Sequence, residues 1–144
     1  ALRRWAAAFE GCHATRQGEG GLGLRLQRQF QRGFAAGAEQ VVLIGSDLPK
    51  LEPRDLEQAF QALEHRSLVL GPAADGGYWL IGLDRAGFLR AGAGLMAGVP
   101  WGSAAVLAST LSQAALLGLE PQLLRRHRDL DQRTDLRHWL GRAR

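Results

Sequence analysis

The hydrophobic residues of this chain form short unbroken runs. Val-Val-Leu-Ile occupies 41–44, and Ser-Leu-Val-Leu occupies 67–70. Apolar runs without alternation are typical of strands that are buried on both faces, as parallel α/β sheets require. We therefore expect 41–46 to form a central strand and 67–70 to form a second buried strand.

Apolar residues at helical spacing occupy most of the chain between and around these runs. The first clear stripe begins at Leu22 and predicts a helix that ends near Gly37. Further stripes predict a helix that begins at Pro53, a short helix from Ala86 to Ala91, a helix with Ser103 as N-cap, and a last helix that begins at Thr134 or Asp135. A strand, a helix and a strand over 41–70 form a βαβ unit, whose strands should run in the same direction.

The order of these elements predicts an α/β fold. Residues 119–124 add a last strand candidate, and the chain of 144 residues suits one domain, 1–144. Alternating strands and amphipathic helices pack as three layers, with helices on both faces of a mostly parallel sheet. A composition of 46% hydrophobic and 22% charged residues is that of an ordinary globular domain.

The net charge of +4 does not by itself indicate a nucleic-acid-binding protein. Lys50 is the only lysine, and the arginines are spread along the chain, with one local cluster at 125–128 that contains no aromatic residue. No apolar run approaches the roughly 18 residues of a membrane helix. The first five residues do not resemble a signal peptide. We therefore expect a cytoplasmic protein without nucleic-acid or membrane partners.

Acidic residues follow the predicted strands. Asp47 comes after the first strand, where open α/β sheets bind their ligands, so it could hold a metal or a ligand hydroxyl or could cap the next helix. Asp75-Gly76-Gly77 could bring backbone amides close to a ligand or could be a hairpin turn. Asp131, with Asp129, could bind a ligand or could compensate the dipole of the last helix.

Several motifs together resemble one bacterial family. They are Val-Leu-Ile-Gly-Ser-Asp-Leu-Pro at 42–49, Gly-Pro-Ala-Ala-Asp-Gly-Gly-Tyr at 71–78, Val-Pro-Trp-Gly-Ser at 99–103 and Asp-Leu-Asp at 129–131. Gly-Leu-Gly-Leu-Arg-Leu at 21–26 also resembles its pattern. The family consists of glycosyltransferase-like domains of unknown function, including selenium- and arsenosugar-associated transferases. It is similar to the phospholactate and molybdenum-cofactor guanylyltransferases. The resemblance covers essentially the whole chain in the same order.

The resemblance implies a nucleotide-diphospho-sugar transferase fold of the GT-A, Rossmann-like type and a divalent metal, Mg²⁺ or Mn²⁺. It implies that Asp47 and Asp131 bind the metal and that Ser46 and Asp47 contact the nucleotide. Asp75 would act as the catalytic base. The remaining residues of the implied acceptor site are Gly71, Gly76, Gly77, Tyr78, Trp101 and Ser103.

One part of the family pattern has no counterpart in this chain. Family members begin with a strand and a basic loop that should hold the nucleotide phosphates, and nothing in 1–40 resembles that loop. We therefore expect the sheet to lack its first strand and the domain to be incomplete at its amino terminus.

Three functions agree with these features. The first is metal-dependent transfer of a sugar from a nucleotide-diphosphate donor to a small acceptor. The second is nucleotidyl transfer, guanylyl or cytidylyl, from a nucleoside triphosphate to a phosphorylated small molecule. The third is a non-catalytic remnant that binds a ligand or a partner chain. The sequence does not indicate an oligomeric state.

Overall fold

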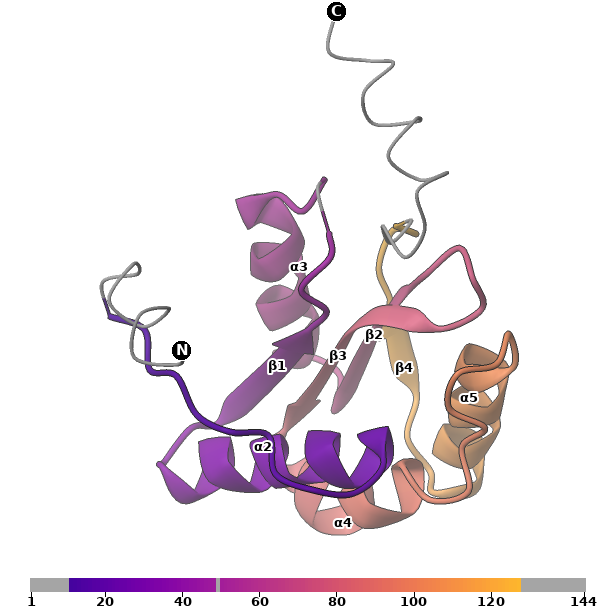
Figure 1. The fold of residues 1–144 in the computed structure, drawn as a ribbon, viewed down its shortest axis with the longest axis horizontal. Helices are drawn as coiled ribbons and strands as arrows, with labels where there is room; N and C mark the ends of the chain where they lie inside the picture. Colours follow the sequence, from indigo (N-terminus) through magenta and orange to yellow (C-terminus); the bar gives the residue numbers. More distant parts are fainter. Residues whose placement is uncertain (1–10, 49, 128–144) are drawn as a thin grey trace, which may run out of the picture.

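The computed structural model describes residues 11–48 and 50–127 and shows an α/β fold of three layers (Figure 1). The elements in chain order are α2 (Leu22–Ala35), β1 (Gln40–Ile44), α3 (Pro53–Leu63), β2 (Leu68–Pro72), β3 (Tyr78–Asp84), α4 (Arg85–Leu95), α5 (Val106–Leu116) and β4 (Pro121–Leu123). Within these residues, no helix combines the length and apolar character that crossing a bilayer requires. The predicted last helix and the predicted metal ligand Asp131 come after residue 127 and lie outside the described residues.

The four described strands are arranged in the order β1-β3-β2-β4. β3 is antiparallel to both β1 and β2, whereas β2 and β4 are parallel. Three of the four strands therefore run in the same direction, as predicted, and β1 and β2 of the predicted βαβ unit share that direction. However, they are not neighbours, because β3 lies between them.

The burial prediction for the first strand was wrong. Val41, Val42 and Leu43 are only partly buried, and Ile44 is 44% exposed, because β1 lies at one end of the described four-stranded sheet. The buried strands are β2 and β3. Sequence pattern alone did not distinguish them from β1, because all three contain continuous apolar runs.

The two faces of the sheet are covered by different helices (Figure 1). One core joins α2, α4 and α5 to the sheet through residues such as Phe30, Leu95 and Leu70. The other joins α3 to the opposite face through Ala59, Leu63 and Trp79. The alternation of side chains along β2 and β3 supplies both cores from the same two strands.

Two helix boundaries differ from the prediction. α4 extends to Leu95, beyond the predicted end at Ala91, because Gly92 and Leu95 are buried against the core. α5 begins at Val106 rather than directly after Ser103. The Ser103 hydroxyl instead accepts a hydrogen bond from the Ala105 amide at 3.2 Å, in the turn before the helix.

Candidate active site

Three chain segments meet at one edge of the sheet because β1, β2 and β4 share a direction. Ser46 and Asp47 follow β1, the turn 73–77 follows β2, and Arg125 follows β4. This is the edge at which α/β sheets bind ligands. The topology therefore places the segments with the predicted chemistry at a common edge, although β3 interrupts the parallel strands.

The Asp-Gly-Gly motif forms the hairpin turn between β2 and β3. The Ala73 amide donates to the Gly77 carbonyl, and the Gly77 amide donates to Asp75 Oδ1, both at 2.9 Å. This is an Asx turn, in which the carboxylate replaces a backbone acceptor. The motif is therefore a hairpin turn. The amides of Gly76 and Gly77 donate hydrogen bonds within the turn, whereas the carboxylate of Asp75 is exposed.

Gly76 joins this turn to the start of α5. Its φ of +93° belongs to the region that favours glycine, and a Cβ there would lie 2.1 Å from the Ala104 carbonyl oxygen. The Gly76 carbonyl accepts a hydrogen bond from the Leu107 amide at 2.9 Å. The turn is thereby fixed against the segment that carries Trp101 and Ser103.

A cavity of about 390 Å³ lies between the turn and this segment. Five of the predicted acceptor-site residues line it together: Asp75, Gly77, Tyr78, Trp101 and Ser103. The rings of Tyr78 and Trp101 meet edge to face, with centroids 6.2 Å apart. The cavity thus combines an exposed carboxylate, a hydroxyl and aromatic surface, which is a combination suited to a small hydroxylated ligand.

The Tyr78 hydroxyl is buried and has no hydrogen-bond partner of good geometry among the described residues. Burial raises the pKa of Tyr78 to about 12, although the nearby Thr110 hydroxyl opposes this shift. The hydroxyl of Thr110 itself donates to the Val106 carbonyl at 2.9 Å. Tyr78 therefore stays protonated at neutral pH, and it lines the cavity while its hydroxyl is buried.

A second cavity of about 280 Å³ adjoins the first, since Leu22 and Tyr78 line both. Ser46, which was predicted to contact the nucleotide, lines this second cavity together with Gly45 and Gln17. Five of the predicted acceptor residues and Ser46 thus lie along neighbouring cavities, whereas Asp47 and Gly76 line neither. The close approach of α2 depends on Gly23, where a Cβ would lie 2.9 Å from the Trp101 indole nitrogen.

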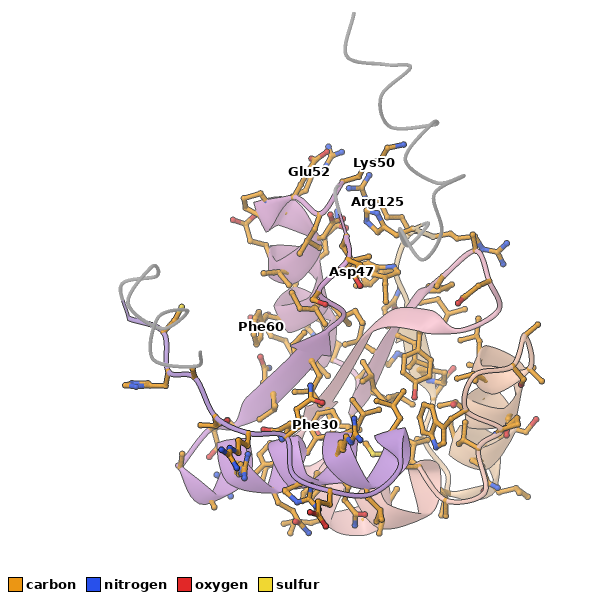
Figure 2. The ribbon with its side chains drawn as sticks, viewed as in Figure 1. Phe30, Asp47, Lys50, Glu52, Phe60 and Arg125 are labelled. Carbon is orange, nitrogen blue, oxygen red and sulfur yellow. The ribbon has the colours of Figure 1, made fainter. Side chains whose placement is uncertain are left out.

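Asp47 is exposed, and it forms no hydrogen bond or ion pair with the other described residues (Figure 2). Its carboxylate is the kind of oxygen ligand that Mg²⁺ and Mn²⁺ prefer. The described residues contain no group of three or more His, Cys, Asp or Glu that could hold a metal. Asp47 fits the metal as one ligand, and its predicted partner Asp131 lies outside the described residues.

Gly71 does not line either cavity. A Cβ at this position would lie 2.4 Å from the Trp79 ring, so Gly71 lets the indole pack against β2. A further surface hollow, of about 660 Å³, lies between α3 and β4 and contains none of the predicted site residues. It is a shallow groove with polar side chains, and we assign the site to the two smaller cavities on the chemistry of their linings.

The sequence interpretation missed an ion pair at the same edge. Asp55 is 1% exposed and binds the Arg125 guanidinium through both oxygens, Oδ1 to Nε at 2.6 Å and Oδ2 to Nη2 at 2.8 Å. Hydrogen bonding from Arg125 holds the pKa of Asp55 well below its usual range, and the pair raises the pKa of Arg125. The only sequence signal was Asp55 in the first turn of a helix, since the partner is 70 residues away.

The fold of this chain matches the fold of a nucleotide-diphospho-sugar transferase. A crystal structure from Desulfovibrio desulfuricans G20, provisionally assigned as a nucleotide-diphospho-sugar transferase, superposes with a TM-score of 0.80 at 32% sequence identity. The match covers 91% of this chain and 56% of that one, so this chain spans a little over half of its length.

The chain belongs to the bacterial family described as "uncharacterized protein conserved in bacteria (DUF2064)", which matches residues 1–103. A comparison with curated proteins gives no match. The expectation of a GT-A-like domain of unknown function is thereby confirmed, as is the fold class.

Proposed function

We propose that this protein is a metal-dependent glycosyltransferase that moves a sugar from a nucleotide-diphosphate donor to a hydroxyl group of a small acceptor. The observation that carries the proposal is the common lining of one cavity by Asp75, Tyr78 and Trp101. That cavity adjoins a second one at the end of β1, beside Ser46. The assignment of the similar structure from Desulfovibrio supports the same reaction class.

The acceptor side has the groups that hydroxyl activation needs. The exposed carboxylate of Asp75 keeps Oδ2 available while Oδ1 accepts the Gly77 amide. A carboxylate in this position orients an acceptor hydroxyl and takes its proton. The Trp101 ring, together with Tyr78, offers aromatic surface to a sugar or similar ring.

The donor side is the end of β1. Ser46 would contact the nucleotide, and Asp47, together with Asp131, would hold Mg²⁺ or Mn²⁺. A divalent cation there supplies neutralisation of the charge on the departing diphosphate. Asp47 is exposed and forms no ion pair with the other described residues. Its carboxylate would therefore bind a metal without first breaking another interaction.

The proposed reaction is a single displacement. The acceptor oxygen forms a bond to the anomeric carbon while the bond from that carbon to the diphosphate breaks. The hydroxyl proton passes to Asp75, and the nucleoside diphosphate leaves with the electron pair. The arrangement contributes chiefly by orientation, since it brings the two substrates together beside Tyr78.

Titration calorimetry of Mn²⁺ and of UDP- and GDP-sugars tests the donor side. Asp47→Ala should weaken binding at least about tenfold, while Glu57→Ala, which removes an exposed acid from α3, should leave it unchanged. Equal binding by wild type and Asp47→Ala would remove Asp47 from this role.

Product analysis tests the reaction itself. Release of a nucleoside diphosphate from a sugar donor supports the proposal. Release of pyrophosphate from a nucleoside triphosphate would assign nucleotidyl transfer instead. Donor binding that stays absent after a strand and basic loop of the family type are added at the amino terminus would contradict both reactions and favour a non-catalytic role.

A further inference from the structure

The segment that carries Asp47 connects β1 to α3 and contains little regular structure. Asp47 itself is exposed and makes no side-chain contact that would orient it among the described residues. A carboxylate on such a segment samples many positions unless the ends of the segment are fixed. Leu48, the next residue, packs against the core beneath α3, and its carbonyl accepts a hydrogen bond from the Leu51 amide at 3.2 Å. These contacts and those at the two ends of the segment together decide how precisely Asp47 is placed.

The first end is fixed by the backbone of Trp79. The Gly45 amide, directly after β1, donates to the Trp79 carbonyl at 2.9 Å. Trp79 is 1% exposed and packs over Gly71 in the core beneath α3. The chain therefore leaves β1 from a rigid point.

The second end is fixed by Arg125. Besides its two bonds to Asp55, the guanidinium lies 3.5 Å from the Lys50 carbonyl oxygen and 3.8 Å from Glu52 Oε1. The Asp55 carboxylate also accepts the Glu52 amide at 2.9 Å. A single arginine thereby contacts the end of the segment and the first turn of α3 together, as Figure 2 shows for Arg125, Lys50 and Glu52.

The two ends are joined to each other through the same tryptophan. The Trp79 indole nitrogen donates to the Arg125 carbonyl at 3.1 Å. The chain on both sides of Arg125 is held by β2, through the bond from the Leu124 amide to Leu70 and from the His127 amide to Pro72. A continuous series of contacts thus joins Gly45 to Asp55 through Trp79 and Arg125. Asp47 lies in the chain segment between Gly45 and Asp55.

We propose that Arg125 is a positioning residue that holds the Asp47 segment in the geometry needed for ligand binding. Residues that orient a ligating group from behind typically change metal affinity by roughly 10–100-fold when they are replaced. The bidentate geometry requires a guanidinium, because a lysine ammonium cannot bond both carboxylate oxygens in the same fixed plane. The role of Asp47 as metal ligand rests on the proposed function, whereas the restraint on the segment does not.

Hydrogen exchange and Mn²⁺ titration of the same variants test this proposal. In Arg125→Met, the hydrogen-bonded amides at the ends of the segment, those of Gly45, Leu51 and Glu52, should exchange at least about tenfold faster, and Mn²⁺ should bind at least about tenfold more weakly. Arg125→Lys should give intermediate values. Arg126→Met is the matched control, since Arg126 is the exposed neighbour without an ion pair among the described residues, and it should behave as wild type.

The outcomes separate this proposal from the proposed function. Exchange in Arg125→Met at the wild-type rate would overturn the positioning role. Faster exchange in Arg125→Met together with no Mn²⁺ binding by the wild type would retain the positioning role and contradict the metal role of Asp47. If Arg125→Met does not fold, Asp55→Asn provides the same test from the other partner, because it preserves size and removes the charge.

Discussion

The turn at 73–77 and the segment after β1 each present a carboxylate at the same edge of the sheet, but they are held in different ways. Asp75 is oriented within its own turn, by the Gly77 amide two residues away. The segment of Asp47 depends on Arg125, which lies far along the chain and reaches it through Asp55 and Lys50. The comparison shows that a local motif can specify one half of a site while the other half depends on the assembled fold.

The largest expected effect comes from the local half. Gly76→Ala should lower the free energy of unfolding by about 4 kcal/mol, because it combines a strained φ with overlap on the Ala104 backbone. Gly102→Ala is the matched control: its φ is +81° but no atom lies within 4 Å of the place that a Cβ would occupy, so the cost should be about 1 kcal/mol. Denaturant unfolding measures both, and equal losses would show that the contact with α5 does not matter.

The stability that the Asp55–Arg125 ion pair contributes should decrease at low pH. The folded pKa of Asp55 lies below its ordinary value of 3.8, so its stabilisation is complete above that pH and is lost as the pH falls further. We expect a loss of about 2 kcal/mol, less than for a fully buried pair because Arg125 is 40% exposed. In Arg125→Met, the free energy of unfolding should decrease less steeply as the pH falls from 5 to about 2. Unfolding measurements across this range test the difference. An equally steep decrease in that variant would contradict the pairing.

The smallest expected effect concerns Tyr78, which lines both cavities. Tyr78→Phe removes a buried hydroxyl without a good partner among the described residues, so the free energy of unfolding should stay equal or rise by up to about 1 kcal/mol. The folded pKa of Tyr78, about 12, exceeds its ordinary value of 10.0, so wild type loses stability as the pH rises between these values. The free energy of unfolding of the variant should not decrease over this alkaline range. A marked loss of stability at neutral pH would instead show that the Tyr78 hydroxyl forms a stabilising hydrogen bond.

Much of the fold was predictable because its signals are local. The stripe from Leu22 and the proline at the first turn of α3 identified helices that the structure contains. The apolar runs identified β1 and β2, and the turn residues identified the hairpin. Each of these signals depends on residues a few positions apart, where backbone preference and periodicity act directly.

Strand order was not predictable in the same way. The hairpin turn indicates that 78–83 runs antiparallel to β2, but nothing in the sequence indicates that this strand inserts between β1 and β2. The exposure of Ile44 follows from that order, since β1 is left at one end of the described sheet. The burial of a strand is decided by its neighbours in space, which period and composition do not encode.

The sequence by itself determined most of the elements, the hairpin turn at Asp75 and five of the residues that line the cavity beside this turn. The resemblance to a transferase family rested on the same motifs. Only the tertiary structure decided which strand lies at the end of the sheet and how Arg125 is joined to Asp55. The physical reason is that turns and helices are stabilised by contacts within a few residues, whereas an ion pair across 70 residues forms only after the sheet has brought β4 beside α3.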